Sequence, residues 1–173
     1  AKEMLLNRIA EIYNDHSYLL EGPQVRENDR KVFEQLADEV SGNPTDAMLK
    51  TSIALLMKLM WGYYGKPVIL LLDEYDVPIA KASAKGYYAE MLDVVKGLMQ
   101  ALKDNDALRF AVITGCLRIA KESIFTGTNN FVSDTISSSH LNESFGFTQA
   151  DIDQILKDAD CLEHAADIKN WYD

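Results

Sequence analysis

Two adjacent carboxylates, Asp73 and Glu74, directly follow a run of five apolar residues at positions 68–72. An Asp at such a position can hold Mg²⁺, directly or through water, and a neighbouring Glu can polarise an attacking water molecule. Because successive side chains of a strand point to opposite faces, the two acids cannot do the same work. The pair therefore predicts a metal or nucleotide site. The alternative is an ordinary solvated loop, where a strand returns to water.

The element that must position these acids is the apolar run itself. Five apolar residues without polar alternation predict a strand buried on both faces, as in a parallel sheet between helices. The acids would then lie at the carboxyl end of the strand, and ligands of open α/β sheets bind outside such ends. The same arrangement forms the Walker B motif of P-loop NTPases, where the metal neutralises charge on the β- and γ-phosphates.

A second buried strand is predicted over residues 108–114, Leu-Arg-Phe-Ala-Val-Ile-Thr. It ends at Thr114 and follows a helix that apolar spacing predicts over residues 86–103. Strand, helix and strand with short connections form a βαβ unit, so Thr114 would lie beside Asp73 and Glu74. Its hydroxyl could then hydrogen-bond the attacking water or a γ-phosphate oxygen. The simpler interpretation is that Thr114 only ends its strand.

Two basic residues follow this second strand end. Arg118 could reach the same phosphates with its planar guanidinium, or it could pair with Glu122 at the i, i+4 spacing of a helix. Lys121 is a weaker candidate for the same role, and a solvent-exposed position explains it equally well.

The rest of the chain is predicted to be mainly helical. Helices are predicted over residues 2–20, 29–40, 43–64, 116–125 and 162–171, and a further helix follows a capping-box variant at 148–151. The sequence also predicts a turn at Val77-Pro78 and a weaker third strand over 131–136. We therefore expect a three-layer α/β fold, with a parallel sheet flanked by helices. Its parts would be a helical segment (1–64), a strand-bearing core (65–136) and a helical C-terminal segment (137–173).

Composition narrows the class of protein. The 173 residues carry a formal net charge of −10, which argues against direct nucleic-acid binding by this segment, because binding to phosphates needs a basic face. Cys116 and Cys161 are far apart and in no metal-ligand spacing, so we expect a reduced, cytoplasmic protein. The most apolar part of a predicted helix, residues 52–64, is shorter than the roughly 20 residues of a membrane span. We expect no signal peptide, because residues 1–8 contain no apolar core.

A phosphate-binding loop is missing from the sequence. Such a loop requires Gly, four residues, and then Gly-Lys-Ser/Thr at the start of a helix. The chain's single Gly-Lys pair, Gly65-Lys66, is followed by Pro67 and leads into a strand. The cradle for the phosphates is therefore not in this chain.

Four ordered motifs resemble the AAA-ATPase-like family, whose members are mostly bacterial proteins of poorly defined function. They are Leu71-Leu72-Asp73-Glu74-Tyr75-Asp76-Val77-Pro78, the stretch from Val112-Ile113-Thr114-Gly115 to Gly127-Thr128-Asn129-Asn130, Phe145-Gly146-Phe147-Thr148, and Trp171-Tyr172-Asp173. The resemblance runs from the first predicted helix to the last residue. Many members carry a C-terminal nuclease-like domain of the PD-(D/E)XK type.

The resemblance implies a P-loop NTPase fold truncated at its N-terminal phosphate-loop unit. The Walker A segment would precede this chain and the nuclease-like domain would follow it. Asp73 and Glu74 take the Walker B positions, Thr114 takes a sensor position, and Arg118 lies in the family's Thr-Gly-x-x-Arg stretch. The full-length protein would then use Mg²⁺ and ATP. We expect this segment alone to bind neither and to be inactive as an enzyme.

Two other functions compete with an ATPase module. One is a non-catalytic scaffold or interaction domain with a degenerate NTPase fold. The other, the weakest, is a metal-dependent phosphodiesterase built on Asp73, Glu74 and Asp76. The truncation also predicts a free edge on the strand that ends at Thr114, which invites either a homo-oligomer or a substitute strand.

Overall fold

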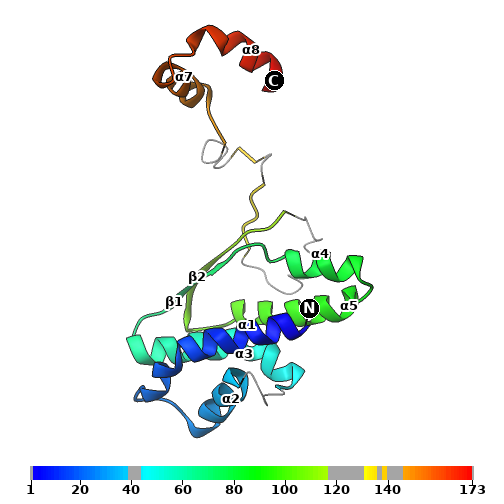
Figure 1. The fold of residues 1–173 in the computed structure, drawn as a ribbon. Helices are drawn as coiled ribbons and strands as arrows, with labels where there is room; N and C mark the ends of the chain where they lie inside the picture. The colour runs from blue at the N-terminus through cyan, green and yellow to red at the C-terminus, as the bar shows by residue number, and fades with distance from the viewer. Residues whose placement is uncertain (1, 39–43, 117–130, 136–137, 140–145, 173) are drawn as a thin grey trace. The chain divides into compact units, whose positions relative to one another are not determined.

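The computed structural model describes residues 2–38, 44–116, 131–135, 138–139 and 146–172 (Figure 1). The chain divides into two compact units, Ala1–Asn129 and Asn130–Asp173. Each unit is described by itself.

The first unit begins with a helical subdomain. Helix α1 (Lys2–Asp15) is followed by the 3₁₀ helix η1 (Ser17–Glu21), then by α2 (Glu27–Ala37) and the long α3 (Asp46–Tyr64). The first predicted helix thus stops short of residue 20, and at that end a ring nitrogen of His16 lies 2.7 Å from the carbonyl oxygen of Ile12. The fully buried side chains at the centre of this subdomain are Tyr13, Leu19, Phe33, Leu36 and Leu49.

The start and the end of α3 follow ordinary capping chemistry. The Thr45 hydroxyl accepts a hydrogen bond from the backbone N–H of Met48 at 3.3 Å, which satisfies one of the free donors of the first turn. Gly65 then ends the helix in the left-handed conformation, at φ 65°, where a side chain would be strained. The chain is released there into the first strand.

The sheet consists of two parallel strands, β1 (Val68–Leu72) and β2 (Leu108–Ile113), paired in the register Leu70↔Ala111 and Leu72↔Ile113. Helix α4 (Val77–Ala84), helix α5 (Tyr88–Met99) and the 3₁₀ helix η2 (Gln100–Leu102) connect them. The predicted strand, helix, strand order is confirmed. The structure is a mixed α/β fold with a two-stranded parallel sheet flanked by helices, and its described residues contain no further strand.

The two faces of the sheet have different surroundings. Val68, Leu70 and Leu108 pack against the buried side chains of Met57 and Ala101. On the opposite face, apolar side chains remain about half or more exposed: Ile69 51%, Leu71 72%, Phe110 49% and Val112 48%. The prediction of burial on both faces is therefore wrong for this structure, because the side chains of each strand alternate between a covered and an open face. We call these four residues the open sheet face.

Two further predictions were wrong. Residues 131–135 form no strand, and residue 136 lies outside the described residues. Val77-Pro78 opens helix α4 and does not form a turn. Proline is tolerated in the first turn of a helix because the N–H that it lacks has no partner there anyway. Apart from Cys116, the short helix predicted over residues 116–125 lies outside the described residues.

The second unit contains helix α7 (Gln149–Asp158), the 3₁₀ helix η3 (Leu162–His164) and helix α8 (Ala165–Tyr172). The predicted capping box is confirmed. The Thr148 hydroxyl accepts from the Asp151 N–H at 3.3 Å, and the Asp151 carboxylate accepts from the Thr148 N–H at 2.8 Å. These bonds fix the start of α7.

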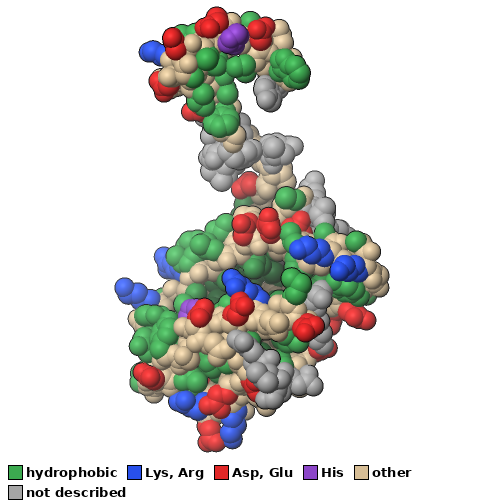
Figure 2. Space-filling model, in the orientation of Figure 1, with side chains coloured by type: hydrophobic (Ala, Val, Ile, Leu, Met, Phe, Trp, Pro, Cys, Tyr) green, Lys and Arg blue, Asp and Glu red, His purple; other side chains and the backbone are tan. Residues whose placement is uncertain are grey.

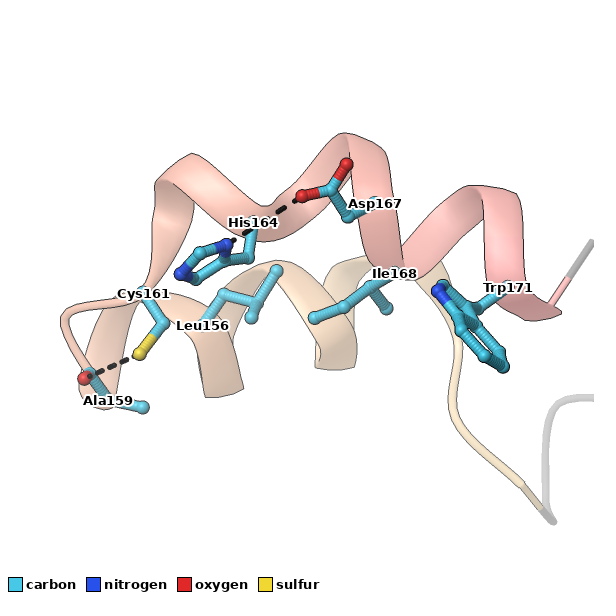
Figure 3. A pocket seen from close by; sticks show the side chains of 7 residues that line it. All are labelled: Leu156, Ala159, Cys161, His164, Asp167, Ile168 and Trp171. Carbon is cyan, nitrogen blue, oxygen red and sulfur yellow. Dashed lines mark hydrogen bonds and ion pairs between the residues drawn. The ribbon is translucent and has the colours of Figure 1, made fainter.

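The helices of the second unit border an open hollow of about 540 Å³ with a mainly apolar lining (Figure 3). Its lining residues are Leu156, Ala159, Cys161, His164, Asp167, Ile168 and Trp171. Trp171 lies at one end of the hollow and is 84% exposed.

Across the described parts of both units, no helix has the combined length and apolar character that crossing a membrane would require.

Candidate functional site at the carboxyl ends of β1 and β2

The two strands stay paired beyond their last residues. The N–H of Thr114 donates to the carbonyl oxygen of Leu72 at 2.9 Å, and the N–H of Tyr75 donates to the carbonyl oxygen of Thr114 at 3.1 Å. These backbone bonds place Asp73 and Thr114 beside each other, as adjacent parallel strands require.

The Thr114 side chain connects the two predicted acids. Its hydroxyl donates a hydrogen bond to Oδ1 of Asp73 and accepts one, at 3.3 Å, from the backbone N–H of Glu74. All three residues are exposed, so the carboxylates are open to solvent and to a ligand. The structure thus brings together three of the residues that the sequence singled out, Asp73, Glu74 and Thr114.

Glu74 has an unusual backbone conformation. Its φ is 52°, in the left-handed region that an L-residue enters at a cost of roughly 1–2 kcal/mol. Such strain persists where the surroundings hold it and is common at functional sites. Here the hydrogen bond from the Glu74 N–H to Thr114 is one of the contacts that hold it.

Asp76 is the residue whose place the sequence did not indicate. The sequence suggested Asp76 only as a metal ligand in the phosphodiesterase hypothesis. In the structure the residue is buried, at 2% exposure. Its Oδ2 accepts the backbone N–H of Cys116 at 3.0 Å. The sequence signal for its place was ambiguous, because an Asp directly before Val77-Pro78 fits the start of a helix as well as the turn that was predicted.

Gly115 allows the two loops to approach closely. A Cβ at this position would lie 2.6 Å from Cε1 of Tyr75 and 2.7 Å from Oδ1 of Asp76, closer than van der Waals contact permits. The Tyr75 ring therefore packs on bare backbone. Burial, and secondarily the charge of Asp76, raise the pKa of the Tyr75 hydroxyl.

The exposed carboxylate of Asp73 suits Mg²⁺ better than it suits a metal ion whose ligands all come from the protein. Mg²⁺ usually keeps several waters and takes one or two carboxylates plus substrate phosphates, and Asp73 offers such an exposed carboxylate. Within the described ranges, no three His, Cys, Asp or Glu side chains are arranged to hold a metal ion. The trio of the phosphodiesterase hypothesis is accordingly not assembled, because Asp76 is buried against Cys116.

The two basic candidates from the sequence cannot be placed relative to this site. Arg118 and Lys121 lie outside the described residues. The hollow of Figure 3 belongs wholly to the second unit. In the space-filling view, acidic and basic side chains are interspersed over the visible face of the first unit (Figure 2).

Comparison with known proteins shows the family to which this chain belongs. The family described as "Predicted AAA-ATPase" matches residues 8–125, more than half of the chain, and includes both strands and the strand-end residues. The chain belongs to this AAA-ATPase-like family. It is also similar to an uncharacterized protein in the vnfD 5′ region of Azotobacter chroococcum mcd 1, with 33% identity over 110 residues. That match covers 62% of this chain but 21% of the relative, so the chain corresponds to about a fifth of the relative's length. No solved structure shows a significant match.

Proposed function

We propose that this chain carries the Walker B and sensor part of an ATP-binding and ATP-hydrolysing module in a longer protein. The observation that carries the proposal is the hydrogen bond between the Thr114 hydroxyl and the Asp73 carboxylate, at the carboxyl ends of neighbouring parallel strands. In sheets of this class, that edge is where nucleotides bind.

Each residue has a distinct role in the proposal. Asp73 would hold Mg²⁺, which when bound would neutralise charge on the β- and γ-phosphates. Glu74 would polarise the attacking water, and Thr114 would orient that water or a phosphate oxygen. Arg118 would contact the phosphates.

The phosphate-binding part of the module, the Walker A segment, would come from a segment upstream of this chain. Its proposed place is beside β2 and over the open sheet face, where apolar side chains are about half or more exposed. Parallel sheets in soluble proteins normally have both faces covered, which supports this arrangement. Without that segment, we expect this chain not to bind ATP.

Isothermal titration with Mg-ATP tests the proposal. The full-length protein should bind Mg-ATP, and its Asp73→Asn variant should bind it at least about tenfold more weakly at matched Mg²⁺ concentration. Glu90→Gln, which alters an exposed acid on α5, is the matched control and should bind normally. Absence of binding by the full-length protein would contradict the proposal.

That negative outcome would favour the alternative function, a non-catalytic scaffold or interaction domain. The open sheet face supports this alternative, because exposed apolar patches often mark sites of contact with other proteins.

A further inference from the structure

Asp76 is a buried acid without an assigned role in the ATPase proposal. Its side chain is 2% exposed in the turn between β1 and α4. A buried carboxylate is costly unless hydrogen bonds compensate its lost hydration. Here the Asp76 carboxylate accepts the N–H of Cys116 at 3.0 Å, and it occupies the N-cap position of α4, where the helix dipole favours negative charge.

The position of this hydrogen bond is informative. Asp76 lies two residues after Glu74, and Cys116 lies two residues after Thr114. Together with the bond from the Tyr75 N–H to the Thr114 carbonyl, it closes the two loops just beyond the strand-end site. Both site-bearing segments are thus held on each side, by the sheet before them and by the Asp76 bond after them.

Gly115 shows how closely the loops are held. The space that a Cβ would need is already taken by the Tyr75 ring and by Oδ1 of Asp76. A loose pair of loops would leave room for a methyl group at this position. The contacts between the two loops also hold Glu74, whose strained backbone conformation persists only where neighbouring residues stabilise it.

We propose that Asp76 is a positioning residue that clamps the loop after β2 to the loop after β1. The clamp sets the spacing between the Thr114 hydroxyl and the Glu74 carboxylate. The proposal rests on the ATPase function proposed above. Because Asp76 is buried, it acts through the Cys116 backbone and not by contact with a substrate.

Amide hydrogen exchange tests the clamp without ATP. Replacing Asp76 with Ala removes the acceptor, so the Cys116 amide should exchange about tenfold faster or more. Asp76→Asn keeps an acceptor oxygen and should retain most of the protection. Asp93→Asn, at an exposed acid on α5 that pairs with Lys50, is the control and should leave the Cys116 amide unchanged. Far-UV circular dichroism checks that each variant folds. Unchanged Cys116 exchange in a folded Asp76→Ala variant would overturn the clamp.

Kinetics of the full-length protein test the positioning role. Asp76→Ala should lower kcat for ATP hydrolysis about tenfold or more, leave KM for Mg-ATP within about threefold, and be partly rescued in Asp76→Asn. An unchanged kcat, or a rise in KM that accounts for the whole defect, would overturn the role. If the wild-type protein hydrolyses no ATP, the proposed function and the positioning role both fail, and the exchange result then decides on the clamp alone.

Discussion

The hydroxyl of Thr114 hydrogen-bonds the carboxylate of Asp73, 41 residues earlier in the chain, across the ends of two adjacent parallel strands. The same hydroxyl accepts the backbone N–H of Glu74. One small side chain therefore fixes the first acid through its carboxylate and the second through its backbone. Because all three residues remain exposed, the arrangement is both held and accessible, as a ligand site requires.

The left-handed backbone at Glu74 predicts an unusual stability ranking. Glycine adopts this conformation without the side-chain penalty, whereas alanine keeps the penalty. We expect Glu74→Gly to be more stable than Glu74→Ala by about 1 kcal/mol. Urea denaturation of the two variants measures the difference. Equal stabilities, or a more stable alanine variant, would mean that the conformation is unstrained.

The close approach at Gly115 predicts a cost for a single added methyl group. Gly115→Ala should destabilise the first unit by about 1–3 kcal/mol, because the new Cβ overlaps the Tyr75 ring. Gly62 in α3 is the matched control: a Cβ there meets only Gln24, at 3.9 Å, so Gly62→Ala should be neutral or stabilising by up to about 1 kcal/mol. Thermal denaturation compares the two, and similar shifts in Tm would contradict the crowding.

The open sheet face predicts self-association of the isolated chain. Leu71 is its most exposed residue, at 72%, so Leu71→Lys should reduce association while leaving the fold intact. Met4 on α1 is equally exposed but lies outside this face, and Met4→Lys should change nothing. Sedimentation velocity at several concentrations gives the assembly state. A monomeric wild-type chain at all concentrations would contradict self-association through the open sheet face.

The capping box of α7 predicts acid sensitivity in the second unit. Hydrogen bonds from the Thr148 side chain and backbone lower the pKa of Asp151 below its usual value of 3.8. A lowered pKa in the folded state means that the stabilisation is present above the unfolded pKa and lost as the pH falls through the folded one. Helicity followed by circular dichroism from about pH 5 to pH 2 should therefore drop more in the wild type than in Thr148→Ala. Parallel curves would show that the capping box contributes nothing.

Both strands were predictable from sequence, because β1 is a run of five apolar residues and β2 is apolar apart from Arg109, and both follow turn residues. The meeting of Asp73 and Thr114 followed from chain topology alone, since a short βαβ unit aligns the carboxyl ends of its strands. The capping box at Thr148 was predictable because its chemistry is local.

The rest depended on contacts between distant residues. An apolar run does not reveal what covers each face, so the open sheet face was invisible in the sequence. The proline at position 78 fits a turn as well as a first helical turn, and only the structure decides between them. The burial of Asp76 depends on Cys116, 40 residues away, and no local pattern encodes it.

ATP hydrolysis by the full-length protein carrying Glu74→Gln tests the central claim most directly. This change keeps the size of the side chain and removes the group proposed to polarise water. We expect Mg-ATP binding to persist and the hydrolysis rate to fall about a hundredfold or more, while Glu90→Gln hydrolyses at the wild-type rate. An unchanged rate in Glu74→Gln would remove Glu74 from the chemistry and contradict the account.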